Sequence, residues 1–144
     1  MRHAIAATIA ALTMSVPHAE AHRPTTHTFT SAVTAGRPGN CDSWRPAYQH
    51  MVQAGMFGRR GAPGWTWFRT VMRRESGCGL DRFNERTGDS GLFQLNPVHR
   101  HWLLREQGIH FSTLRWNNVA GLKAMAALYR KVGTCAWNPR GYCG

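Results

Sequence analysis

The sequence predicts a mainly helical, single-domain protein with a small irregular or β-hairpin lobe. At 144 residues, the chain has room for one domain. Apolar residues recur at helical spacing in segments 44–52, 68–75 and 119–129, as expected of helices that bury one face. Residues 79–96 contain too many Asn, Gly, Asp, Thr and Ser residues for a long helix, so they predict a loop or a short hairpin.

The N-terminal 40 residues are expected to lie outside this domain. Residues 1–21 predict a signal peptide, because a short basic start is followed by an apolar run too short to span a bilayer and by Ala19-Glu20-Ala21, which fits a cleavage site. A buried N-terminal helix is the alternative, but such a helix rarely carries this order of segments. Residues 22–40, rich in Thr, Ser, Pro and Gly, predict a flexible linker, and residues 41–144 the folded domain. We therefore expect a secreted monomer without a stable membrane span.

The net charge of the chain indicates which classes of partner to expect. The formal net charge is +11, and the positive residues are dispersed along the chain. An exported protein of this charge is expected to meet anionic cell-wall polymers or membranes. We do not expect nucleic acid as a partner, because the chain contains no recognisable nucleic-acid-binding motif and is expected to be exported.

Four cysteines are typical of a secreted, disulfide-bonded domain, and they allow three connectivities. We expect Cys41–Cys78, which would tie the opening helix to the loop after residue 75, and Cys135–Cys143, which would close a short C-terminal loop. A zinc site is the competing interpretation, but the chain has no CxxC pair. His99 and His101 are two residues apart and no HExxH is present, so we expect them at the surface and expect no metal or cofactor.

Helix boundaries follow from capping residues and glycines. The first expected helix is capped by Ser43 and runs to about Val52, before Gly55. The second lies between the Gly61–Gly64 turn and Gly77, and the third runs from Val98 to Gln107, before Gly108. The fourth is capped by Asn117 or Asn118 and ends at Gly133.

Glu75 is the main candidate for chemistry. Phe68, Val71 and Met72 form an apolar stripe, and Glu75 continues it at i+7 in the last turn before a glycine. Burial raises the pKa of a carboxyl group, as a general acid near neutral pH requires. Arg74 adjoins it in sequence but is expected to point to another helix face and so need not pair with it. A structural glutamate that holds the following loop is the alternative.

The other glutamates of the expected mature chain, Glu85 and Glu106, have polar surroundings in the sequence and are expected to be solvated. Of the six tryptophans, Trp44, Trp65 and Trp67 are expected in the core, whereas Trp102, Trp116 and Trp137 are candidates for a groove.

Three segments together resemble the soluble lytic transglycosylases and goose-type lysozymes. They are Glu75-Ser76-Gly77, the stretch from Thr87 to Asn96 that reads TGDSGLFQLN, and Ala126-Ala127-Leu128-Tyr129. Their order and spacing match, and the likeness covers roughly residues 65–137. The resemblance implies a lysozyme-like fold with a substrate groove. It also implies peptidoglycan as substrate, cleaved at the β-1,4 bond between N-acetylmuramic acid and N-acetylglucosamine.

The resemblance also implies roles for individual residues. Glu75 matches the catalytic acid of the family, and Tyr129 matches the tyrosine that orients it. The stretch from Gly91 to Gln94 matches the groove wall, where backbone groups and the Gln94 side chain would hold the sugar. The implied substrate-binding residues are Ser90, Gly91, Leu92, Phe93, Gln94, Asn96 and Tyr129. The C-terminal end departs from many transglycosylases, since it lacks the usual YNxG segment.

Three functional hypotheses remain. A lytic transglycosylase would use the C6 hydroxyl of the substrate and form 1,6-anhydro ends, whereas a hydrolytic lysozyme would use water, normally aided by a second carboxylate. Asp89 and Asp81 are the candidates for that carboxylate, and Asp89 could instead brace its loop. Because neither is a confident base, we favour the transglycosylase. A non-enzymatic, cationic wall-binding or antimicrobial protein is the alternative from another class.

Overall fold

A computed structural model describes residues 26–138, and its architecture is mainly helical, as predicted. The α-helices are α1 (Thr26–Thr34), α2 (Arg45–Gln53), α3 (Trp65–Ser76), α4 (Arg100–Gln107) and α5 (Asn118–Val132). Short 3-10 helices are η1 (Cys41–Trp44), η2 (Gly58–Arg60), η3 (Pro97–His99), η4 (Phe111–Arg115) and η5 (Gly133–Trp137). The expected signal peptide and the residue Cys143 lie outside the described residues.

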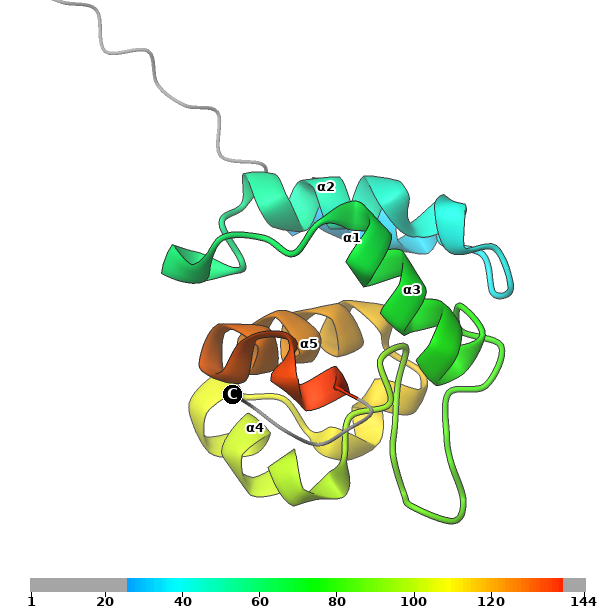
Figure 1. The fold of residues 1–144 in the computed structure, drawn as a ribbon, viewed down its shortest axis with the longest axis vertical. Helices are drawn as coiled ribbons and strands as arrows, with labels where there is room; N and C mark the ends of the chain where they lie inside the picture. Colours follow the sequence, from blue (N-terminus) through cyan, green and yellow to red (C-terminus); the bar gives the residue numbers. More distant parts are fainter. Residues whose placement is uncertain (1–25, 139–144) are drawn as a thin grey trace, which may run out of the picture.

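The helices surround α5. In Figure 1, α1 and α2 lie together at one end of the molecule, α3 runs from them toward the 77–96 loop, and α4 and η5 lie near α5 at the other end. Eight of the residues of α5 are buried, from Gly121 to Tyr129 with the exception of Lys123. A helix that is apolar on most of its surface belongs in a core, and this one supplies the centre to which the other helices add one face each.

The expected linker is wrong for residues 26–40, because Thr26–Thr34 forms a helix that packs on α2. Phe29 and Val33, four residues apart, fall on one face of α1 and are buried in the core. The Phe29 ring stacks on His50 of α2 at a centroid distance of 5.3 Å. The composition of this segment is mostly polar and does not indicate a buried helix. Two apolar residues at i and i+4 are nevertheless enough to form a buried stripe.

The first helical segment of the expected domain, η1, has a different N-cap residue from the one predicted. Asn40, rather than Ser43, is the capping residue: its Oδ1 accepts hydrogen bonds from the N–H groups of Asp42 and Ser43 at the start of η1. The Ser43 hydroxyl instead donates to the Asn40 carbonyl oxygen at 2.6 Å. The Cys41–Cys78 disulfide is confirmed, and it ties η1 to the turn after α3.

Glycines end the later helices as predicted. Gly77 (φ 56°) and Gly108 (φ 63°) follow α3 and α4 in the left-handed conformation, and Gly133 follows α5. Asn117 is the cap of α5, since its side chain accepts from the N–H of Ala120. These signals are local, which explains why the sequence predicts them well.

Residues 77–96 form the predicted irregular lobe. It contains isolated bridges between Phe83 and Ser90 and between Ser90 and Leu95. Ser90 and Leu95 exchange both backbone hydrogen bonds, at 3.0 and 2.9 Å, around a tight turn. The lobe is therefore a compact loop rather than an extended hairpin.

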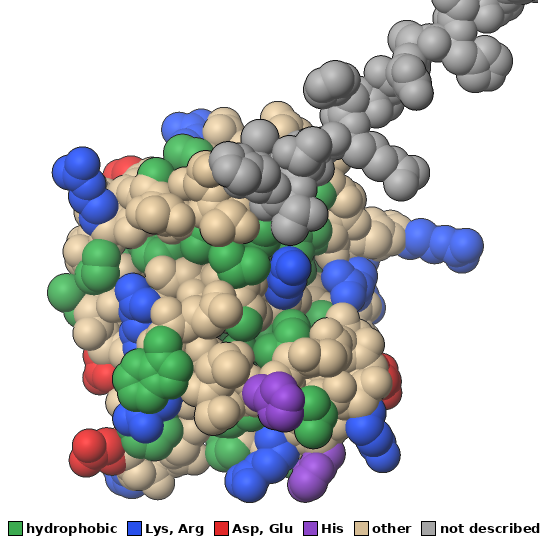
Figure 2. Space-filling model, turned by 180° about the vertical axis from the view of Figure 1, so that it is seen from behind, with side chains coloured by type: hydrophobic (Ala, Val, Ile, Leu, Met, Phe, Trp, Pro, Cys, Tyr) green, Lys and Arg blue, Asp and Glu red, His purple; other side chains and the backbone are tan. Residues whose placement is uncertain are grey.

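On the surface, Lys and Arg side chains are spread among few acidic ones over the face in Figure 2. The described helices include none with the length and apolar character needed to cross a bilayer.

Candidate active site

Glu75 lies in the last turn of α3. The apolar stripe that precedes it is confirmed, because Phe68, Val71 and Met72 are all buried. The Glu75 side chain itself is only partly buried, with an exposed fraction of 23 %. The apolar stripe therefore leads to a carboxyl group at the edge of the core, within reach of solvent and of a ligand.

Arg74 pairs with Glu75, contrary to the sequence-based expectation. Its Nε and Nη2 donate to Glu75 Oε1 at 2.9 and 2.5 Å. The same Nη2 donates to the carbonyl oxygen of Trp137 at 2.6 Å. Adjacent helix residues diverge by about 100° around the axis, but the long guanidinium arm reaches back along the end of the helix, where no further turn blocks it.

Ser76 joins the two segments that carry the family resemblance. Its hydroxyl is buried and lies 2.7 Å from the carbonyl oxygen of Leu92 and 3.2 Å from that of Met72. It also accepts from the N–H of Gly79 at 3.0 Å. One side chain thus fastens the end of α3, the following turn and the 90–96 turn to one another.

The turn from Gly91 to Gln94 is held by one internal residue and by two residues from other parts of the chain. Its first three carbonyl oxygens, in chain order, accept from Gln94, Ser76 and Trp137. Gly91 has φ 86°, and a Cβ there would lie 3.2 Å from the Leu114 carbonyl oxygen, so only glycine fits both the dihedral and the close approach.

Within this turn the side chains divide into two groups. Leu92 and Phe93 are buried in the core, at 1 % and 0 % exposure, so neither the side chain nor the backbone of either residue is open to a ligand in this structure. Gln94 is half-buried and adopts φ 45°, one of two positive values among the described non-glycine residues, the other being Cys78. Its Nε2 donates to the Gly91 carbonyl oxygen at 3.1 Å. A non-glycine residue with this uncommon backbone conformation is strained, and strained residues cluster at functional sites.

Tyr129 is buried in an aromatic cluster. Its ring contacts Phe57 edge-on at 5.6 Å and Trp67 at 5.8 Å, and Trp67 in turn contacts Trp137. The hydrogen bonds of the described residues include none between Tyr129 and Glu75. Tyr129 is therefore linked to Trp137 through the Trp67 ring.

The two candidate second carboxylates are engaged in the loop. Asp89 Oδ2 accepts from the Thr87 hydroxyl at 2.8 Å, and Oδ1 accepts from Asn96 Nδ2 at 2.9 Å. Asp81 is exposed and accepts from the N–H of Phe83 at 3.3 Å. Asn96 also caps η3 through the N–H of Val98. The Asp89–Asn96 hydrogen bond therefore closes the loop formed by residues 89–96. Ser90, the residue after Asp89, is buried.

Among residues 26–138, three ionisable groups have displaced pKa values. Burial lowers the pKa of Arg82, whose Nε donates to the Gly79 carbonyl oxygen beside the site. Burial raises the pKa of Tyr48, with a smaller contribution from Tyr129. Burial also lowers the pKa of His99, helped by the positive charge of Lys131. His99 is thus partly buried rather than at the surface as expected, whereas His101 is exposed.

The groove candidates among the tryptophans have different surroundings. Trp137 is buried and donates to the Phe93 carbonyl oxygen at 2.9 Å. Trp102 is partly buried and donates to Glu106, and Trp116 is 72 % exposed. Within residues 26–138, no group of three or more His, Cys, Asp or Glu side chains is arranged to hold a metal ion.

Sequence reasoning missed two residues of this site. In the sequence, Ser76 stands out only as the middle residue of the Glu75-Ser76-Gly77 segment. Arg74 is expected on another face of the helix. No periodic pattern could have revealed either, since both act through contacts with residues 92 and 137. Comparison of the chain with models of known protein families, with curated proteins and with solved structures found no match.

Proposed function

We propose that the protein is a secreted enzyme that cleaves peptidoglycan glycan strands, with Glu75 as the general acid. The observation that carries the proposal is the Ser76–Leu92 hydrogen bond, which joins the helix end that carries the partly exposed Glu75 carboxyl group to the 91–94 turn. A glycosidic oxygen is a poor leaving group until it is protonated, so a carboxyl group next to groups that can hold a sugar is the minimal requirement.

The turn offers groups suited to an amide-bearing sugar. Leu92 and Phe93 occupy its two central positions, and their N–H groups make no hydrogen bond to another described residue. The carboxamide of Gln94 lies at the end of the same turn. The half-buried carboxamide can bind the carbonyl and hydroxyl groups of an N-acetyl sugar, whereas the N–H groups of Leu92 and Phe93 are buried and could do so only if the turn opened.

Arg74 sets a condition on this chemistry. Its guanidinium donates two hydrogen bonds to Glu75 Oε1 and so occupies that oxygen. A glycosidic oxygen could approach Oε1 only when the pair opens. The Trp137 carbonyl oxygen already accepts from Arg74 and can retain the guanidinium when it leaves the carboxylate.

The reaction we favour is lytic transglycosylation with formation of 1,6-anhydro ends. Both carboxylate oxygens of Asp89 are occupied by side chains of its own loop, and Asp81 accepts a backbone hydrogen bond. Neither arrangement is suited to activating water. Attack by the C6 hydroxyl of the substrate needs no second carboxylate, because the hydroxyl is held next to the anomeric carbon. A hydrolytic lysozyme is the alternative.

The test is mass spectrometry of the products that the protein releases from purified peptidoglycan. We expect 1,6-anhydro fragments, each lighter by one water than the hydrolytic product, from wild type and from Glu85→Gln, the control on an exposed glutamate. Glu75→Gln should release almost none. Hydrolytic ends as the main product would support the lysozyme. Wall binding with no cleavage by any form would instead establish the non-enzymatic, cationic wall-binding protein.

A further inference from the structure

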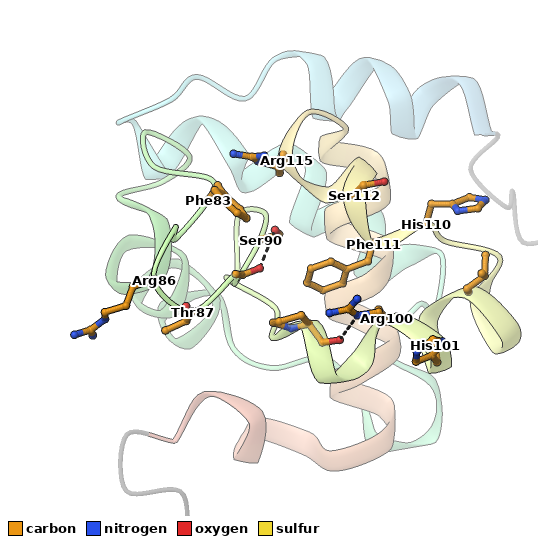
Figure 3. A pocket seen from close by; sticks show the side chains of 13 residues that line it. Phe83, Arg86, Thr87, Ser90, Arg100, His101, His110, Phe111, Ser112 and Arg115 are labelled. Carbon is orange, nitrogen blue, oxygen red and sulfur yellow. Dashed lines mark hydrogen bonds between the residues drawn. The ribbon is translucent and has the colours of Figure 1, made fainter.

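A second candidate binding site lies on the other side of the 83–90 loop. A hollow of about 690 Å³ separates this loop from α4 and η4, and Glu75 is not part of its wall. Phe83 and Ser90 line it from the loop side, and Arg100, Phe111 and Arg115 from the helical side. Figure 3 shows the Phe111 ring at the centre of the hollow, with Arg115 and Arg100 on opposite sides of it.

The hollow is positively charged. Three arginines and two histidines contribute to its wall, and no aspartate or glutamate does. The ion pairs found in the described part of the chain, Arg69–Asp42 and Arg74–Glu75, involve none of these cations. A concave surface whose positive charges have no acidic partner concentrates the field and attracts anions.

Arg115 is held in place by aromatic rings rather than by hydrogen bonds. Its guanidinium carbon lies 3.5 Å from the centroid of the Phe83 ring and 4.8 Å from that of Trp116. Its buried Nε has no hydrogen-bond partner among the described residues. Stacking fixes the plane of a guanidinium but satisfies none of its donors. Because Nε is buried, an incoming acceptor would bind the terminal nitrogens of the group.

Arg100 is the second cation that faces inward. Its Nε donates to the Pro97 carbonyl oxygen at 3.3 Å, which fixes the side chain at the start of α4. In Figure 3 its guanidinium lies below the Phe111 ring, whereas Arg86 and His110 point away from the hollow. Two guanidinium groups and two phenylalanine rings therefore contribute to the wall of the hollow, and one of these guanidinium groups, that of Arg115, is stacked on the Phe83 ring.

We propose that this hollow binds a phosphate ester. Arg115 and Arg100 would approach the ligand from the two sides of the Phe111 ring, and the carbon body of its alcohol would lie against the rings of Phe83 and Phe111. Guanidinium groups bind phosphate through paired hydrogen bonds, and two of them match its charge better than that of a carboxylate. The same chemistry is found in small phosphomonoesters and in phosphodiester polymers, so the test includes both. The proposal does not depend on the activity proposed for Glu75.

The first experiment is isothermal titration of the intact protein with glycerol 3-phosphate, with inorganic phosphate and with glycerol. We expect glycerol 3-phosphate to bind, inorganic phosphate to bind more weakly, and glycerol not to bind. Arg100→Gln and Arg115→Gln should each weaken binding by about tenfold, the usual effect of losing a charge-assisted hydrogen bond. Arg105→Gln is the matched control, because it removes one exposed charge from α4 outside the hollow.

Equal weakening by Arg105→Gln would overturn the proposal, since net charge alone would then explain binding. Equal affinity for inorganic phosphate and glycerol 3-phosphate would overturn the role of the phenylalanine rings. If Arg115→Gln does not fold, backbone amide shifts of the wild type on adding glycerol 3-phosphate decide the matter. They should change in residues 83–90 and 97–115, and changes confined to residues 74–77 would contradict the location.

A second titration with poly(glycerol phosphate) separates the two sources of the ligand. Tighter binding per phosphate than that of glycerol 3-phosphate, lost in the same two variants, would identify a phosphodiester polymer. Affinity for the monoester alone would identify a small phosphomonoester. Failure of both probes to bind would overturn the proposal and leave the Glu75 activity unaffected, since that activity is measured separately on peptidoglycan.

Discussion

The Ser76 hydroxyl donates a hydrogen bond to the Leu92 carbonyl oxygen at 2.7 Å, across 16 residues of sequence. This contact joins the helix that carries Glu75 to the turn that carries Gln94. It is also buried, so both groups would lose water without gaining a partner if the contact were removed. The geometry of the candidate active site depends on it more than on the Glu75 side chain itself.

Ser76→Ala is therefore expected to lower the free energy of unfolding by about 1–3 kcal/mol, the range for a buried acceptor left unpaired. The N–H of Gly79 would lose its acceptor as well. Urea denaturation followed by circular dichroism measures the change. Thr66→Ala, an exposed hydroxyl on the same helix, is the control and should change stability little. Equal stability of Ser76→Ala and wild type would show that the hydrogen bond is not a structural tie.

Glu75→Gln should lower the turnover of peptidoglycan by roughly 100-fold or more, since glutamine cannot donate a proton to the leaving oxygen. The melting temperature should change little, because the Arg74–Glu75 pair is partly exposed. Release of soluble fragments measures turnover, and Glu85→Gln serves as the charge-matched control. Activity within a few-fold of wild type would rule out Glu75 as the acid.

Asp89→Asn should retain the 1,6-anhydro products but lower stability by about 1 kcal/mol, because Asp89 braces its loop through Thr87 and Asn96. Product masses and urea denaturation of the same preparation measure the two effects. If wild type releases mainly reducing ends and the variant releases none, Asp89 is instead the base of a lysozyme.

The basic surface is expected to concentrate the enzyme on anionic wall polymers and to contribute little to the chemical step. At 0.1 M salt the screening length is about 10 Å, so dispersed surface charges lose most of their long-range attraction as salt rises. Raising salt should weaken lysis of whole walls far more than cleavage of short, neutral fragments. Equal salt sensitivity on both substrates would place the effect inside the site.

His99 should make the protein less stable in mild acid. Its pKa lies below the ordinary value of 6.5, because burial and Lys131 disfavour the charged form. As the pH falls below that value, the unfolded chain binds a proton that the native state still excludes, so the free energy of unfolding falls. Above it both states are neutral, and the contribution of His99 is fully retained.

His99→Asn should therefore make the stability difference between about pH 7.5 and 5.5 smaller than in wild type. Urea denaturation at the two pH values measures this, and His101→Asn, at an exposed histidine, should leave the difference unchanged. A difference equal to that of wild type in His99→Asn would contradict the assignment.

Short-range patterns in the sequence determined most of the secondary structure. Gly77, Gly108 and Gly133 end helices as predicted, and Asn117 begins one, because a left-handed residue or a side-chain cap acts within a few residues. The stripe of Phe68, Val71 and Met72 likewise predicted which face of α3 is buried. The Cys41–Cys78 bridge is the favoured one of the pairings that four cysteines allow, and it is confirmed.

Only the tertiary structure decided how these elements meet. The burial of Phe29 against His50, the reach of Arg74 to Glu75 and Trp137, and the stacking of Arg115 on Phe83 all join side chains whose contact no periodic pattern encodes. The physical reason is that a long or aromatic side chain takes its position from the space left by packed neighbours. That space exists only once helices distant in sequence have come together.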